Sequence, residues 1–241
     1  SIMDSLLPPG SESSRGFTFW LGTDGAGRDL FSAILYGLRV SLAVGVSSAF
    51  IALIVGMTIG LVAAYAGGRT EALIMRIVDV QLSFPAILIA LLLLALLGKG
   101  VDKIVIALVV AQWAYYARTV RGSALVERSK EYVEAARMTG EADRNIMFMH
   151  ILPNCFAPLV VRLSLDFASA ILTESSLSFL GLGFPPPTPS WGLMLKEVSP
   201  FLELQPWAAF VPGLTISIMI LGFNLLGDGL RDVFDPRQYE R

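Results

Sequence analysis

The sequence predicts an all-α protein, a polytopic bundle of transmembrane helices. Of its 241 residues, 54% are hydrophobic and only 16% are charged, whereas soluble domains carry roughly 25% charged residues. The mean hydropathy is +0.66. The apolar runs are continuous and do not alternate with polar residues, which indicates spanning helices and argues against the strands of a membrane barrel.

Five stretches are long enough to cross a bilayer, which takes roughly 20 apolar residues. They are Val40–Gly68, Ile77–Gly98, Val101–Val120, Asn154–Phe179 and Leu204–Gly227. The third is the shortest, because Lys103 and Arg118 bound its uncharged part and must extend to opposite interfaces. The fourth contains Arg162, Asp166 and Glu174.

The distribution of Lys and Arg predicts the topology. These residues collect between the third and fourth spans and after the fifth, so the segments 118–153 and 231–241 are expected in the cytoplasm. Residues 1–38 then form a periplasmic segment, and 39–230 form the transmembrane domain. One apolar face in the first segment predicts an interfacial helix; it is formed by Leu30, Phe31, Ile34 and Leu35.

Several functional classes are excluded by composition. The net charge of −2 gives no field that would attract nucleic acid, and single Cys and His residues leave too few ligands for a Cys-rich metal site. The chain contains no G-x-x-x-x-G-K-[ST] motif, so it has no loop of that type to hold the phosphates of ATP.

The cytoplasmic segment 118–153 is amphipathic. Good helix formers predict a helix over Glu131–Thr139, with Tyr132, Ala135, Ala136 and Thr139 on one face. Gly140 follows at the position where a helix commonly ends in a left-handed residue, and a second short helix is expected over 141–149. Amphipathicity alone equally fits a helix lying on the bilayer surface.

Short motifs give this segment a family resemblance. Glu134-Ala135-Ala136, then Gly140, then Leu152-Pro153 resemble the EAA loop of ABC importer permeases. The superfamily has an aliphatic residue at the position of His150. The run from His150 to Asn154 resembles the branch of the superfamily that carries dipeptides, oligopeptides, nickel complexes and glutathione. Collinear matches lie at Gly22–Asp29, Tyr36–Leu42, Leu177–Gly183, Asn224–Asp232 and Asp235–Arg237.

The resemblance implies a type I ABC importer permease fold, with one more helix before Gly22 than these residues contain. It implies a bacterial inner-membrane subunit that is not itself an enzyme and moves dipeptides or oligopeptides by alternating access. The implied partners are a second homologous permease, two cytoplasmic ATPases that hold ATP and Mg, and a periplasmic binding protein. Contact with the ATPases is assigned to Glu131, Glu134, Ala135, Ala136, Gly140, His150, Leu152 and Pro153.

Polar residues within the spans are candidates for the substrate pathway. Arg162 and Asp166 are four residues apart and share a helix face, so they form either a structural ion pair or a polar wall of the pathway. Glu174, nearer the outer face, either contacts substrate or lies in the headgroup zone. Further candidates, for which helix packing is the alternative, are Tyr116, Asn224, Gln112, Trp113, Tyr115, Thr215 and Ser217. A secondary transporter would leave the EAA loop unexplained. An intramembrane hydrolase would need a Ser–His or paired-Asp site at membrane depth, whereas His150 is expected at the cytoplasmic edge and Asp166 has no partner carboxylate at its depth.

Overall fold

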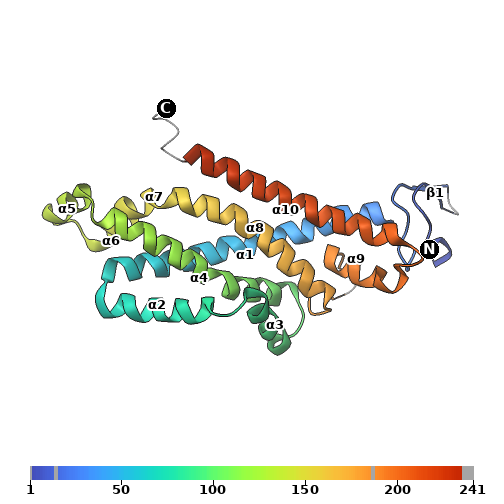
Figure 1. Cartoon of the computed structure of the whole chain (residues 1–241), viewed down its shortest axis with the longest axis horizontal. Helices are drawn as coiled ribbons and strands as arrows, with labels where there is room; N and C mark the ends of the chain where they lie inside the picture. The colour runs from blue at the N-terminus through green and yellow to red at the C-terminus, as the bar shows by residue number, and fades with distance from the viewer. Residues whose placement is uncertain (1, 14–15, 186–187, 235–241) are drawn as a thin grey trace. The chain divides into compact units, whose positions relative to one another are not determined.

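The computed structural model describes residues 2–13, 16–185 and 188–234, and helices dominate them (Figure 1). In chain order the elements are η1 (Ile2–Asp4), β1 (Ser11–Glu12), β2 (Thr18–Phe19), α1 (Leu30–Ala66), α2 (Gly68–Leu82), α3 (Ala86–Leu97), α4 (Val101–Arg128), α5 (Glu131–Met138), α6 (Asp143–Asn145), η2 (Ile146–Ile151), α7 (Leu152–Asn154), α8 (Phe156–Phe179), α9 (Trp191–Val198), η3 (Ser199–Phe201) and α10 (Pro206–Phe234). Of these, η2 is a π-helix.

The chain forms two compact units. Unit 1 comprises residues 1–47, 91–106 and 168–222, and unit 2 comprises 48–90, 107–167 and 223–241. Helices α1, α4, α8 and α10 each contribute residues to both units. The longest of them, α1, has 37 residues and a length of about 55 Å at 1.5 Å per residue.

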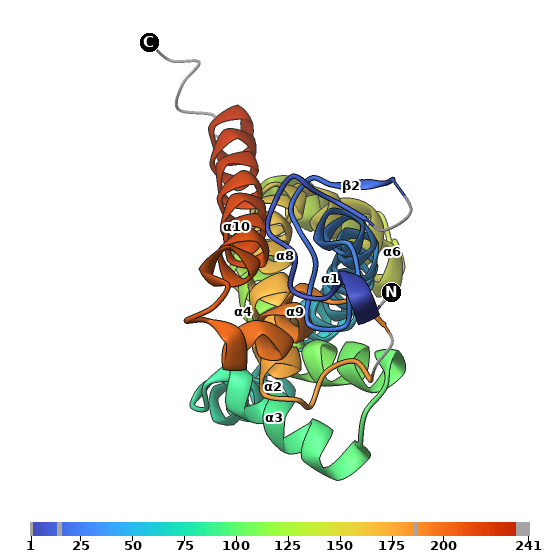
Figure 2. The ribbon, with the colours of Figure 1, turned by 90° about the vertical axis from the view of Figure 1, so that its right-hand side faces the viewer.

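In unit 1 the N-terminal segment is folded against the start of α1 and against α9 (Figure 2). Strands β1 and β2 pair antiparallel, and the backbone N–H of Leu30 donates to the carbonyl of Gly22. Trp191 is fully buried and donates from Nε1 to the carbonyl of Ile34 at 3.1 Å. A side chain at Gly37 would collide with the Trp191 ring, so a glycine is needed where α9 meets α1.

In unit 2, α1 and α4 approach each other at two glycines of α1. A Cβ atom on Gly56 would lie 2.3 Å from the carbonyl oxygen of Trp113, and one on Gly60 would lie 2.3 Å from that of Ala117. The two glycines are four residues apart and therefore face the same side of α1, the G-x-x-x-G arrangement that lets helix backbones touch in membranes. Side chains of α1, α4, α5 and α8 fill the core beside this contact.

The predicted spans are confirmed in part. By length and composition α1, α8 and α10 can cross a membrane. The predicted continuous span Ile77–Gly98 is wrong, because the chain bends by 86° between α2 and α3. Pro85 lies at this break; it has no N–H to donate and disfavours a helical conformation at Phe84.

Helix α4 differs from its prediction. It continues to Arg128, eight residues beyond the expected end at Val120. It does not meet the same criterion for a membrane span, because Asp102, Lys103 and the arginines of its second half reduce its hydropathy. The structure therefore contains three such helices in the described residues, or four if the bent pair is one span, and the count of five is not confirmed.

Three further elements differ from their predictions. Leu30–Leu35 forms no separate interfacial helix, since these residues are the first turns of α1. The expected helix over 141–149 is divided between α6 and η2. Helix α10 extends to Phe234, and the part of the predicted tail at 235–241 lies outside the described residues.

The glycine contact gives a test of the fold. We expect Gly60→Leu to lower the free energy of unfolding by about 3 kcal/mol or more, because overpacking a well-filled contact costs roughly 1–3 kcal/mol and here the obstacle is backbone. Denaturant unfolding in detergent micelles measures the effect. Gly122→Leu in α4 is the matched control, since an added Cβ there meets no atom within 4 Å. Equal stability of the two variants would contradict the contact.

Candidate functional site

Helix α5 ends as the sequence predicts. Gly140 has φ +77°, a left-handed conformation that glycine adopts without strain. The N–H of Gly140 donates to the carbonyl of Arg137, and that of Glu141 donates to the carbonyl of Ala136 at 3.2 Å. This pair of bonds is the Schellman motif, which satisfies the last carbonyls of a helix. The helix is therefore stopped sharply after Met138 and Thr139.

The two faces of α5 differ from the predicted ones. Val133 and Ala136 are buried in the core of unit 2, with Tyr132 packed against it. Ala135, expected on the same face as Ala136, is exposed. Periodicity showed that one face is apolar, but it could not show that the core reaches Val133. The exposed residues Glu131, Glu134, Ala135 and Met138 share the opposite face, and Met138 is 90% exposed.

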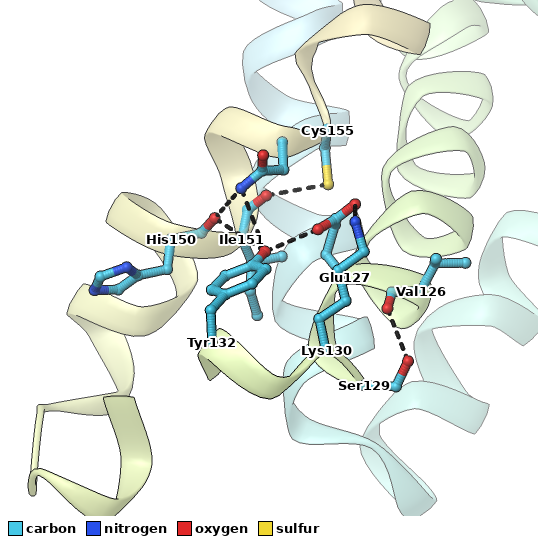
Figure 3. Close-up of polar contacts among 9 residues, drawn as sticks. Val126, Glu127, Ser129, Lys130, Tyr132, His150, Ile151 and Cys155 are labelled. Atoms are coloured by element: carbon cyan, nitrogen blue, oxygen red, sulfur yellow. Dashed lines mark hydrogen bonds and ion pairs between the residues drawn. The ribbon is translucent and has the colours of Figure 1, made fainter. Parts of the chain in front are cut away.

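A hydrogen-bonded network at Glu127 holds α5 in place (Figure 3). Glu127, at the end of α4, accepts from Lys130 Nζ at 2.7 Å and from the Tyr132 hydroxyl at 2.8 Å. Asn154 of α7 donates from Nδ2 to the carbonyl of His150 at 2.8 Å and to the Tyr132 hydroxyl at 3.3 Å. Burial, together with the bond to Glu127, raises the pKa of Tyr132 to about 12, so the hydroxyl remains a donor at neutral pH.

The segment after α5 folds back beside it. The Nε2 atom of His150 lies 2.9 Å from a carboxylate oxygen of Glu141, which closes the segment between them. Leu152 is buried in the same core as Val133, whereas Pro153 is exposed in α7. The residues predicted for this loop therefore lie in one continuous part of unit 2.

Arg162 and Asp166 of α8 form an ion pair. Arg162 makes two contacts with the Asp166 carboxylate, Nη2 to Oδ1 at 2.8 Å and Nε to Oδ2 at 3.1 Å. Asp166 is 1% exposed, while the guanidinium of Arg162 lies 4.5 Å from the centre of the Tyr115 ring. Tyr116, the neighbouring residue of α4, is fully buried in the core of unit 2.

The other pathway candidates are dispersed. Glu174 is buried in unit 1, where its carboxylate accepts from the hydroxyls of Ser41 at 3.2 Å and Ser178 at 2.7 Å. Asn224 of α10 is half-buried in unit 2. The hydroxyls of Thr215 and Ser217 donate to carbonyls of their own helix. A role for these residues in transport stays a prediction.

Comparison with known proteins identifies the family. The family model described as "binding-protein-dependent transport system inner membrane component" matches residues 56–239, a range that contains α5 and the network around it. The chain belongs to this family of importer permeases. The match confirms the expected family on a range that includes the EAA loop.

Relatives of this permease are peptide and glutathione permeases. It is 44% identical to the di/tripeptide transport system permease protein DppC of Pseudomonas aeruginosa over 97% of this chain and 78% of that protein. It is 45% identical to the glutathione transport system permease protein GsiD of Pectobacterium atrosepticum over 90% of this chain and 72% of that protein. The chain is therefore a permease component of an ABC importer in the peptide branch.

Solved structures confirm the type I permease fold. A chain of the inward-facing MetNI methionine ABC transporter superposes with a TM-score of 0.70 and 17% sequence identity, covering 86% of this permease and 98% of that chain. At this identity the likeness supports the fold alone.

Sequence reasoning missed two features of this permease. The first is the contact at Gly56 and Gly60, which form a G-x-x-x-G motif that could have been identified in the sequence. The network at Glu127 had no such signal, since a glutamate near a helix end is usually solvated. Only the structure shows that Tyr132 of α5 contacts Glu127.

The ion pair in α8 gives a prediction. We expect Arg162→Met to lower the free energy of unfolding by about 3–5 kcal/mol, because it leaves the buried Asp166 charge without its partner. The double variant Arg162→Met with Asp166→Leu should recover most of that loss. Denaturant unfolding of the three proteins in detergent provides the comparison. An equal loss in the double variant would show that the charges do not compensate each other.

Proposed function

We propose that this permease is the transmembrane subunit of an ATP-driven importer that moves dipeptides or oligopeptides across the bacterial inner membrane. Alternating access moves the substrate, and partner ATPases supply the energy through α5. The observation that carries the proposal is the geometry of α5. It is a short helix with one face held on the chain's own core and the other face exposed.

The exposed face is suited to a protein groove. Ala135 allows close approach, Met138 offers an adaptable apolar contact, and Glu131 and Glu134 can pair with basic residues. Because Val133 and Ala136 are committed to the core, a partner that holds the exposed face can displace α5 without detaching it. Ala136 then contributes by anchoring the helix, in place of the docking role first expected for it.

Membership of the family supports the proposal for the remaining assembly. A second homologous permease would complete the membrane domain, and two cytoplasmic ATPase subunits would hold ATP and Mg, with no cofactor on this chain. A periplasmic binding protein would deliver the substrate on the other side of the membrane. The lipid-facing surface includes exposed apolar residues of α10 such as Leu214, Ile218 and Leu221.

The substrate class is proposed from the relatives, which carry di- and tripeptides or glutathione, itself a small peptide. Within the permease, the partly exposed Arg162, whose guanidinium carbon lies 4.5 Å from the centre of the Tyr115 ring, is the side chain that we propose for binding a peptide carboxylate. Titration of the cognate binding protein with dipeptides, oligopeptides, glutathione and nickel separates the substrates of this branch. Binding of peptides is expected, and binding of nickel alone would overturn this assignment.

The α5 face gives the functional prediction. We expect Ala135→Arg and Met138→Arg to reduce ATP-driven peptide uptake in proteoliposomes by about tenfold or more, because each adds bulk and charge at the centre of a docking face. The chain should still insert and fold, since both positions are exposed.

The matched control is Val126→Arg in the last turn of α4, which is 61% exposed and lies outside α5. Its uptake should equal that of the unmodified permease. Co-purification of the ATPases should fall in the two α5 variants only. Normal uptake and normal co-purification in both α5 variants would refute the role of α5.

A further inference from the structure

Tyr65, in the last turn of α1, lies between two arginines from other elements. The guanidinium carbon of Arg128, at the end of α4, is 5.7 Å from the centre of the Tyr65 ring, and that of Arg137, in α5, is 5.4 Å from it. Both distances are within the roughly 6 Å at which a cation is attracted to an aromatic face. One aromatic ring therefore links α1 to α4 and to α5.

Two hydrogen bonds complete the arrangement. The Tyr65 hydroxyl donates to the carboxylate of Asp143, the first residue of α6. Arg128 donates from Nη1 to the carbonyl of Ala64 at 2.7 Å, where the last carbonyls of α1 have no partner within the helix. We call the set Tyr65, Arg128, Arg137 and Asp143 the Tyr65 clamp.

The Tyr65 clamp lies beside apolar contacts between the same elements. Leu61 and Ala64 of α1 belong to one core cluster with Val133 and Ala136 of α5. Apolar packing resists separation of α5 from α1 but is not directional. Cation–π contacts and hydrogen bonds have preferred geometries, so the clamp additionally opposes sliding and rotation of α5.

The connections of α5 along the chain are weak by comparison. Ser129 and Lys130 alone join it to α4, and α6 and the π-helix η2 stand between it and α8. π-Helices are rare and are often found at functional sites. A displacement of α5 would be absorbed in these connections unless side chains carried it elsewhere.

We propose that Tyr65 is a positioning residue that transmits the displacement of α5 to α1. This inference rests on the proposed function, because it presumes that an ATPase moves α5. It adds a route out of α5 into the unbroken helix α1, besides the network at Glu127 and the chain connection through η2 to α8. The cytoplasmic end of α1 then moves together with α5 when ATP binds.

The test measures ATP hydrolysed per peptide transported in reconstituted complexes. Tyr65→Leu keeps much of the apolar bulk but removes the ring and the hydroxyl, and we expect it to raise this ratio about three- to tenfold, the size of effect that coupling residues commonly have. Tyr65→Phe retains the ring between the arginines and should raise the ratio less than about twofold. A merely structural role predicts less folded complex with an unchanged ratio.

Arg137→Gln and Arg69→Gln form the second comparison. Both arginines are exposed, but only Arg137 contacts Tyr65, while Arg69 lies in the first turn of α2. Arg137→Gln should raise the ratio by about two- to threefold, and Arg69→Gln should leave it unchanged. If Tyr65→Leu fails to fold, this pair decides alone, since neither change touches the core.

Two failures can be distinguished. The first is an unchanged ratio in Tyr65→Leu while the ATPases remain bound; this result overturns the transmission through Tyr65 and leaves the role of α5 standing. If Tyr65→Leu does not fold, the same result in Arg137→Gln has the same meaning. If the purified permease carries no ATPase, or uptake is normal in Ala135→Arg and Met138→Arg, the proposed function itself fails.

Discussion

The backbone contact between α1 and α4 at Gly56 and Gly60 is the constraint on which unit 2 depends. Without a hydrophobic driving force between helices in lipid, association relies on close packing, and small residues allow the closest approach. The two carbonyl groups of α4 that face these glycines leave no room for any side chain. This contact fixes where the ends of α1 and α4 lie beside each other, and hence where α5 can pack.

The position of α5 depends on that contact. With the helix ends adjacent, Arg128 can satisfy a carbonyl of α1, and Tyr65 can reach α5. Glu127 also holds α5 through its bond from the Tyr132 hydroxyl. An eight-residue helix would be unstable alone in water, so its stability and orientation both come from this tertiary support.

Much of this arrangement could be predicted from the sequence. The apolar runs gave the membrane class, and the EAA pattern with Gly140 located α5 and its end. The break at Pro85 was missed because hydropathy counted the surrounding run as continuous, although proline carries a local signal. The buried face of α5 and the partners of Glu127 and Tyr65 could not be predicted, because they depend on contacts between segments far apart in the sequence.

Electron cryo-microscopy of the assembled transporter, with and without ATP, tests the central claim most directly. The account predicts that Ala135 and Met138 lie against an ATPase subunit in both states. It also predicts that the Tyr65 ring stays between Arg128 and Arg137 while α5 moves. A structure in which no ATPase contacts α5, or in which α5 moves away from Tyr65 when ATP binds, would contradict it.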